Sequence, residues 1–290
     1  MSRFLSAEDA SHISDFLSAP RLRTFLDLTR SGQREDAIEL HQATMTMGTA
    51  ILAVTSLIEV ALRNVACRQL DRVFGRPDWL RNPPETLRWS DIEKRAIKTA
   101  EKNAQRAAYS KMAGPDKAAL DAVAFKDGQD HTLKHKDLAV ARQRAIQVSD
   151  GQIVAQLTMH FWKRMFSESY EAMLWKRGLK RAFPNKSLTR AEVAVQLDVI
   201  YEIRNRLAHH EPVYGRRLEA ILGAISFACI HLGNRDENVV SPFAKLILPQ
   251  REVLLGQVAI MEATFERLTR PSFTAQREKA ATTDSWPGAL

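Results

Sequence analysis

The expected architecture depends on one stretch, Thr189-Arg-Ala-Glu-Val-Ala-Val-Gln-Leu-Asp-Val-Ile-Tyr-Glu-Ile-Arg-Asn-Arg-Leu-Ala-His-His-Glu-Pro212. Thr189 and Glu192 form a capping box, so we expect a helix to begin near Arg190. Pro212 has no backbone N–H and disfavours a helical residue before it, so the helix should end near His210. The apolar positions predict a broad buried face made of Val193, Val195, Leu197, Val199, Ile200, Ile203 and Leu207.

Polar side chains crowd the end of this expected helix: Arg204, Asn205, Arg206, His209 and His210. Cations near a helix C-terminus are favoured by the helix dipole, so a polar cap with a purely structural role is one interpretation. At about 100° per residue, Asn205 and His209 share a face, whereas Arg204 lies roughly 140° from His209. Arg204 and His209 could therefore act on one ligand only if the helix distorts or a second copy of the chain contributes.

Composition indicates an ordinary soluble protein. The chain has 290 residues, 45% of them hydrophobic and 26% charged, which is enough to bury a large core. The formal net charge of +8 favours an anionic partner, with nucleic acid as the first candidate. The cysteines, Cys67 and Cys229, lie in apolar helical stretches and are expected to be buried free thiols. Acidic residues near the N-terminus do not fit a signal peptide, so we expect a cytoplasmic protein.

Helical periodicity dominates the chain and predicts an all-α fold, with a single domain over residues 1–270. The longest helix is expected from Asp36 to Phe74, as a buried core helix and not a membrane span. Residues 91–149 are expected to form a basic insertion that begins with a helix from Asp91 to Met112, and residues 271–290 a disordered tail. Further helices are expected at 6–29, interrupted by Pro20, at 153–166 with Asp150 as its N-cap, at 218–232 and at 249–270. Expected core residues include Phe16, Leu17, Leu22, Phe25, Leu26, Trp162, Phe166, Tyr170, Trp175, Phe183, Val253, Leu254, Val258 and Met261.

The long early helix carries a second polar cluster, Glu59, Arg63 and Asn64. Glu59 and Arg63 are four residues apart and should pair on one helix face. On these residues alone, a structural ion pair at the edge of the core is the favoured interpretation.

Basic residues accumulate just before the stretch that decides the fold. From 163 to 190 the two acidic residues Glu168 and Glu171 stand against eight basic ones: Lys163, Arg164, Lys176, Arg177, Lys180, Arg181, Lys186 and Arg190. We expect RNA to contact this surface through Lys176, Arg177, Lys180 and Arg181, and through Arg206, Tyr214 and Arg216 around the cluster. The aromatic residues in the same stretch are more often core than base-stacking platforms.

The motif Arg204-Asn205-x-x-x-His209 resembles the signature of HEPN-domain ribonucleases, and the wider string with His210 and Glu211 resembles the Abi-like (abortive infection) family. That family carries a similar Glu-x-x-x-Arg-Asn on an early helix, here Glu59 to Asn64, followed by a Gly-to-Trp element, here Gly75 to Trp79. The resemblance covers roughly Ala37 to Gly233, patchily. It implies a HEPN-like helical bundle with additional helices, a homodimer with a composite site, and catalysis by Arg204 and His209. Asn205, His210, Glu59, Arg63 and Asn64 would support them.

The resemblance also implies a role in phage defence, or as a toxin restrained by an RNA or protein antitoxin. Metal-free RNA cleavage suits these residue types, because imidazole can exchange protons near neutral pH and guanidinium binds phosphate. Two alternatives stay open. One is a non-catalytic protein that binds a structured RNA. The other is a metal site at His209, His210 and Glu211, which we do not expect because two adjacent histidines have poor geometry as ligands of one ion. We also expect no metal site at His131 and His135. No cofactor is expected.

Overall fold

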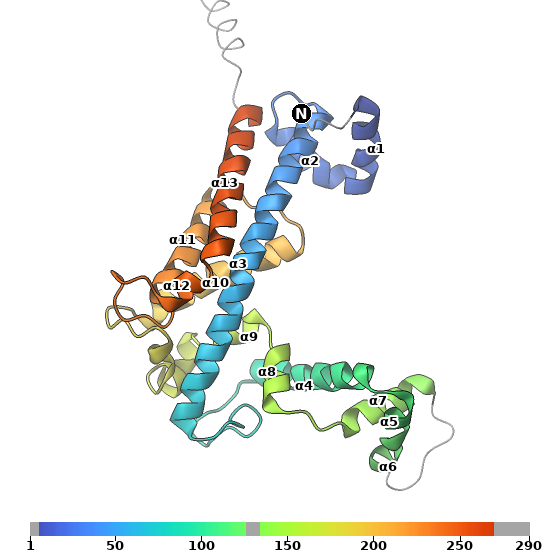
Figure 1. Cartoon of the computed structure of the whole chain (residues 1–290), viewed down its shortest axis with the longest axis vertical. Coiled ribbons are helices and arrows are strands. Elements are labelled where there is room, and N and C mark those ends of the chain that lie inside the picture. Colours follow the sequence, from blue (N-terminus) through green and yellow to red (C-terminus); the bar gives the residue numbers. More distant parts are fainter. Residues whose placement is uncertain (1–5, 126–133, 270–290) are drawn as a thin grey trace, which may run out of the picture. The chain divides into compact units, whose positions relative to one another are not determined.

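The computed structural model describes residues 6–125 and 134–269. These residues are all-helical, with no β-strand among them, which confirms the predicted fold class (Figure 1). The α-helices are α1 (Ala7–Leu17), α2 (Ala19–Leu28), α3 (Arg34–Phe74), α4 (Asp91–Lys111), α5 (Gly114–Ala119), α6 (Asp121–Ala124), α7 (His135–Ala145), α8 (Asp150–Gln156), α9 (Met159–Arg164), α10 (Arg190–Ala208), α11 (Arg216–His231), α12 (Pro242–Leu246) and α13 (Leu248–Thr269). Three short helices of 3-10 or π type separate α9 from α10: η1 (Glu168–Tyr170), η2 (Glu171–Trp175) and η3 (Leu179–Ala182).

The chain divides into two compact units. Of the described residues, unit 1 contains 6–56, 202–223 and 245–269, and unit 2 contains 57–125, 134–201 and 224–244. The helices α3, α10, α11 and α12 each contribute residues to both units. The expectation of one domain over 1–270 stays a prediction, and the expected tail at 271–290 lies outside the described residues.

Unit 1 is built on the first half of α3, and α13 runs alongside it (Figure 1). Its core joins the start of the chain to its last helix through Ala10, Leu22, Phe25, Ala37, Ile38, Leu40 and Leu268. Arg267 Nη2 donates to Glu39 Oε1 at 2.7 Å, and the backbone N–H of Arg30 donates to the carbonyl of Leu268. These contacts tie the two ends of the described chain together.

Unit 2 has an aromatic core. The ring of Trp89 lies 6.2 Å from that of Trp79 and 5.7 Å from those of Phe161 and Tyr170, centroid to centroid. Among these rings the carboxylate of Glu93 is almost fully buried, and it accepts hydrogen bonds from Arg164, Ser90 and Tyr170. The expectation that the aromatic residues between 162 and 183 belong to the core is confirmed, since Trp162, Phe166, Tyr170, Trp175 and Phe183 are all buried.

Several predicted boundaries are wrong. The expected helix at 153–166 is split into α8 and α9, because Leu157 adopts an extended conformation and its carbonyl accepts from Arg63 and from Trp162 instead of continuing the helix. Ser149, not Asp150, caps α8, since the Ser149 hydroxyl accepts the N–H of Gln152 in a capping box. The expected insertion also contains the short helix α5, which begins at Gly114-Pro115 because proline fits the first turn of a helix. The short helix α12 lies between the predicted helices at 218–232 and 249–270, where none was predicted.

Three predicted core residues are exposed: Phe16, Val195 and Val253. On α10 the buried stripe through Val193, Leu197 and Ile200 is narrower than predicted, so Val195 falls on the solvent side. On α13 the buried residue is the next one, Leu254. In α1 the buried residue is Ala10, roughly 120° around the helix from Phe16.

The helix α3 is long and apolar enough to cross a bilayer by length and composition. Half of its most apolar window is buried within the protein, and the core helix of a soluble protein meets the same criterion.

Candidate functional sites

The predicted start of α10 is confirmed, and its end is built differently from the prediction. Glu192 Oε2 accepts the backbone N–H of Thr189 at 2.7 Å, and the Thr189 hydroxyl accepts the N–H of Glu192. The helix ends at Ala208, two residues before the predicted end. His209 and His210 therefore follow the helix and do not occupy its last turn.

A Schellman turn closes α10. The N–H of His210 donates to the carbonyl of Leu207 at 2.9 Å, and the N–H of Glu211 donates to the carbonyl of Arg206 at 2.8 Å, which are the two bonds that define this motif. His210 occupies the left-handed position of the turn, with φ of 57°. Glycine is the usual residue at this position, because a Cβ atom strains the left-handed conformation. The turn leaves both histidine side chains exposed to solvent.

The residues before the turn anchor it. Ile203 and Leu207 are buried, whereas Arg204, Asn205 and Arg206 are half-buried on the other faces of the helix. Gly48 of α3 allows the close approach, because a Cβ there would lie 2.8 Å from Leu207 Cδ2. Half-buried and exposed polar groups are thus held on the end of a helix that is fixed by its apolar side.

Arg206 is already engaged within the chain, because its Nη2 lies 2.6 Å from Glu211 Oε2. This pair crosses the turn, and so it stabilises the turn itself. Tyr214 packs its ring on Phe265, 5.7 Å between centroids, in a cavity of about 320 Å³ between α11 and α13. Arg216, the first residue of α11, is exposed. Of the residues expected to bind RNA around the cluster, Arg216 is therefore the most accessible.

A small cavity of about 110 Å³ lies beside the turn, lined by His210, Glu211 and residues of α2 and α3. His41 lines it from α3, and burial together with the nearby charge of Arg21 lowers the pKa of its imidazole. The cavity is smaller than the roughly 300 Å³ at which ligand pockets begin, so a nucleotide would have to lie outside it, at the exposed histidines.

The predicted pair of Glu59 and Arg63 is confirmed, with Arg63 Nη2 donating to Glu59 Oε1 at 3.0 Å in unit 2. Arg63 Nη2 also donates to the carbonyl of Leu157, and its guanidinium lies 6.0 Å from the centre of the Trp162 ring. These contacts give Arg63 a structural role, since they hold the junction between α8 and α9. Asn64 is exposed. The expectation that Arg63 and Asn64 approach Arg204 stays a prediction.

The basic stretch separates into paired and unpaired cations. Lys163 lies 2.6 Å from Asp198, Arg164 pairs with Glu93, and Arg190 and Lys176 both pair with Glu171. Arg177 is exposed. Lys176 is thus partly neutralised, and the paired cations Lys163, Arg164 and Arg190 stabilise unit 2.

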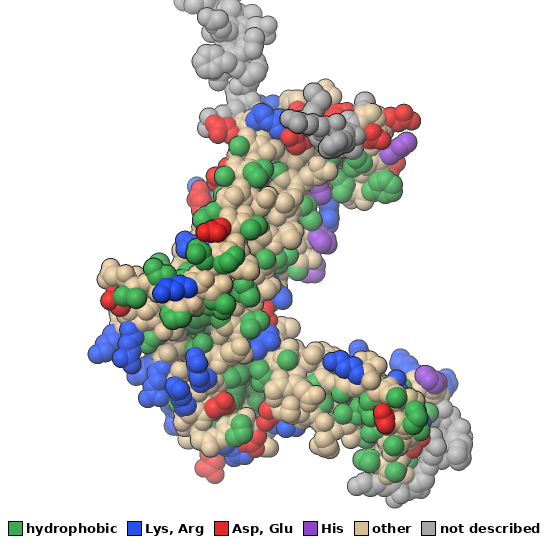
Figure 2. Space-filling model, viewed as in Figure 1, with side chains coloured by type: hydrophobic (Ala, Val, Ile, Leu, Met, Phe, Trp, Pro, Cys, Tyr) green, Lys and Arg blue, Asp and Glu red, His purple; other side chains and the backbone are tan. Residues whose placement is uncertain are grey.

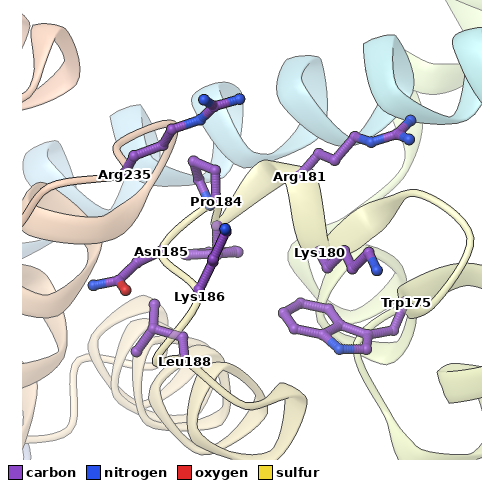
Figure 3. Close-up of a pocket in the computed structure, with 9 residues that line it drawn as sticks. Trp175, Lys180, Arg181, Pro184, Asn185, Lys186, Leu188 and Arg235 are labelled. Carbon is purple, nitrogen blue, oxygen red and sulfur yellow. The ribbon is translucent and has the colours of Figure 1, made fainter.

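Four cations line a hollow of about 740 Å³ in unit 2, which we call the basic pocket (Figure 3). Its lining contains Lys180 and Arg181 of η3, Lys186 of the following loop and Arg235 of the loop after α11. In the described part of the chain, none of these four side chains forms an ion pair with a carboxylate. Lys and Arg side chains gather on this part of the surface (Figure 2). Arg235 was not predicted, because it is distant in sequence and only the tertiary fold brings it to η3.

No group of three or more His, Cys, Asp or Glu side chains is arranged to hold a metal ion within residues 6–125 and 134–269. His131 lies outside these ranges. The end of α10 offers imidazoles for proton transfer and a guanidinium for an anion, and the basic pocket offers cations for phosphate.

No family model matches the chain, and no curated protein or solved structure is significantly similar to it.

Proposed function

We propose that this protein is a metal-independent endoribonuclease of the HEPN type, with its active site at the end of α10. One observation carries the proposal: His209 and His210 are exposed on a rigid Schellman turn, one helical turn after Arg204 and Asn205. A strained left-handed residue at the end of a well-packed helix is typical of functional sites.

The chemistry follows from the side chains. A base removes the proton of the ribose 2′-hydroxyl, and the 2′-oxygen then attacks phosphorus. The bond from phosphorus to the 5′-oxygen breaks, and an acid gives that oxygen a proton. The products end in a 2′,3′-cyclic phosphate and a 5′-hydroxyl. His209 is the histidine we assign to proton transfer, and Arg204 stabilises the charge that develops on the phosphate oxygens.

Asn205 orients the site, and His210 supports it. In a homodimer, the second copy would supply a further histidine and arginine across a two-fold axis, so that acid, base and phosphate clamp are all present. Glu59, Arg63 and Asn64 remain proposed supporting residues. The resemblance to the Abi-like family adds the proposal that the enzyme acts in the cytoplasm, in phage defence or as a toxin restrained by an antitoxin.

A second candidate function is RNA binding without cleavage. The basic pocket favours it, because four unpaired cations in unit 2 would bind a structured RNA whether or not His209 reacts.

The two functions are separated by incubating total RNA with purified protein in a chelator. Wild-type protein should cut RNA, and Arg204→Ala and His209→Ala should abolish cutting while RNA binding is retained. His12→Ala, which removes an exposed histidine of α1, should cut like wild type. Equal cutting by His209→Ala and wild type would reject the assignment of the active site.

A further inference from the structure

We propose that the basic pocket binds a segment of single-stranded RNA, with backbone phosphates on Lys180, Arg181, Lys186 and Arg235. This inference deepens the proposed function, because it rests on RNA as the substrate and names a surface of unit 2 that binds it. Three features of the pocket support it: a backbone frame held by hydrogen bonds and close packing, four cationic side chains without carboxylate partners among the described residues, and an apolar floor.

The frame of the pocket is fixed by hydrogen bonds between segments that are distant in sequence. The backbone N–H of Gly233 donates to the carbonyl of Ala182 at 2.8 Å, which joins the loop after α11 to η3. Asn234 Nδ2 then donates to the carbonyls of Ile230, Asp236 and Val239 at 2.7 to 2.9 Å. These bonds hold the loop on both sides of Arg235, so Arg235 is presented to the pocket without the loop having to reorganise.

Close packing fixes the other side of the frame. A Cβ on Gly178 would lie 2.4 Å from Val73 Cγ2, so the chain just before η3 lies directly against α3. On the far side of η3, Asn185 accepts the backbone N–H of Ser187 at 3.0 Å, which shapes the loop that carries Lys186. Asn185 also donates to Glu237 at 3.4 Å, and Glu237 is not among the residues that line the pocket. Binding would therefore order little beyond the four cationic side chains.

The charges of the pocket are uncompensated. Lys180, Arg181, Lys186 and Arg235 are exposed, and no carboxylate lines the hollow (Figure 3). Neighbouring cations of the same sequence stretch are paired, as Arg190 is with Glu171. Unpaired cations that line one hollow favour an anion with several charges, and a nucleic acid backbone supplies one charge per nucleotide.

The floor of the pocket is apolar, with Trp175, Phe183, Pro184 and Leu188 among its lining residues. Trp175 and Phe183 are buried and each packs edge-on against Phe166, so the floor is fixed, and the half-buried Pro184 and Leu188 are its more accessible part. The volume of about 740 Å³ falls within the range of roughly 300–1,000 Å³ that is usual for ligand sites. An apolar floor below cations fits a strand whose bases are free to turn inward. Such bases belong to single strands, because a duplex hides them.

The test measures binding of a fluorescent single-stranded RNA by anisotropy at several salt concentrations. The probe carries 2′-O-methyl groups throughout, which removes the 2′-hydroxyl needed for cleavage. Binding is then measured whether or not the protein is a nuclease, so failure of this inference and failure of the proposed function are distinguishable. The pocket variant combines Lys180→Gln, Arg181→Gln, Lys186→Gln and Arg235→Gln.

A matched control combines Arg95→Gln, Lys98→Gln, Lys102→Gln and Arg106→Gln on the exposed face of α4. Both variants remove two lysines and two arginines from unit 2 and lower the formal net charge from +8 to +4. The pocket variant should raise Kd by about tenfold or more, and should reduce the slope of log Kd against log salt by up to ~3, at ~0.7 per lost contact. The control variant should stay within about threefold of wild type.

Three results would overturn the inference: equal weakening by both variants, unchanged binding by the pocket variant, and displacement of the probe by a mononucleotide as effectively as by the oligonucleotide. The first would mean that net charge alone attracts RNA, and the third that the pocket takes a small ligand. Circular dichroism checks that both variants are folded. If the pocket variant is not, the pair Lys180→Gln and Lys186→Gln is measured in its place, with an expected reduction of the slope by about 1.4.

Discussion

Replacing His210 by glycine should stabilise the protein while impairing the proposed site. His210 holds the left-handed position of the Schellman turn with φ of 57°. A left-handed residue with a Cβ costs roughly 1–2 kcal/mol, and glycine removes that strain. Glycine also has more freedom in the unfolded chain, which offsets about 0.5–1 kcal/mol of the gain. The net increase in the free energy of unfolding should be about 0.5–1 kcal/mol.

The assay is thermal unfolding followed by circular dichroism, beside RNA cleavage under the same conditions. His210→Gly should raise Tm by about 2 °C. His210→Ala removes the same imidazole but keeps the Cβ atom, so its Tm should not rise. Both variants should cut RNA more slowly than wild type, but faster than His209→Ala, which loses the general acid–base contribution of about 10²–10⁴-fold. An unchanged or lower Tm for His210→Gly would refute the claim that the turn stores strain.

Three further predictions concern unit 2 and the dimer. Burial raises the pKa of Glu93, but the hydrogen bonds from Arg164, Ser90 and Tyr170 outweigh this effect and lower that pKa to about 2. The ionised Glu93 therefore stabilises the fold at pH values above its ordinary pKa. This contribution, about 3 kcal/mol, is lost as the pH falls from about 4.5 towards 2. Glu93→Gln should therefore unfold more readily in urea at pH 7, and the difference from wild type should shrink in acid; a constant difference would contradict the assignment. Gly178→Ala forces a Cβ against Val73 Cγ2 and should cost about 1–3 kcal/mol, whereas Gly151→Ala, whose Cβ would make only an ordinary van der Waals contact with Ser149 Oγ at 3.9 Å, should be nearly neutral; equal melting temperatures would show that the Val73 side chain moves aside at no cost. Mixing equal amounts of wild-type and His209→Ala protein, with subunit exchange, should leave about a quarter of the cleavage of the same total amount of wild-type protein if the site is composite across a two-fold axis, because about a quarter of the dimers then hold both histidines; about half would mean that each chain carries its own site.

Sequence patterns predicted the helices well where a local signal marks their ends. The capping box at Thr189 and the stop after Phe74 were both located to the residue, because capping hydrogen bonds and glycine depend only on neighbours in sequence. The split of α8 from α9 was missed, since it depends on a hydrogen bond from Arg63, which is 94 residues from Leu157.

The candidate sites, too, could be predicted where their residues are close in sequence and not where they depend on tertiary contacts. The polar cluster from Arg204 to His210 is contiguous and could be recognised from the sequence, but the left-handed turn that exposes both histidines could not, because histidine is an uncommon residue there. The basic stretch was visible as composition. Which of its cations are paired was not visible, because Glu93 and Asp198, the partners of Arg164 and Lys163, lie outside the stretch, and the sequence does not show which cations Glu171 contacts. Arg235 reaches the pocket only through the contact of Gly233 with Ala182.

The most direct measurement is mass spectrometry of the fragments from a defined single-stranded RNA, after incubation with wild-type protein in a chelator. We predict that the upstream fragment ends in a 2′,3′-cyclic phosphate and the downstream fragment begins with a 5′-hydroxyl, and that His209→Ala yields neither. Intact RNA with the wild-type protein, or fragments that carry a 5′-phosphate, would contradict a metal-free nuclease at the end of α10.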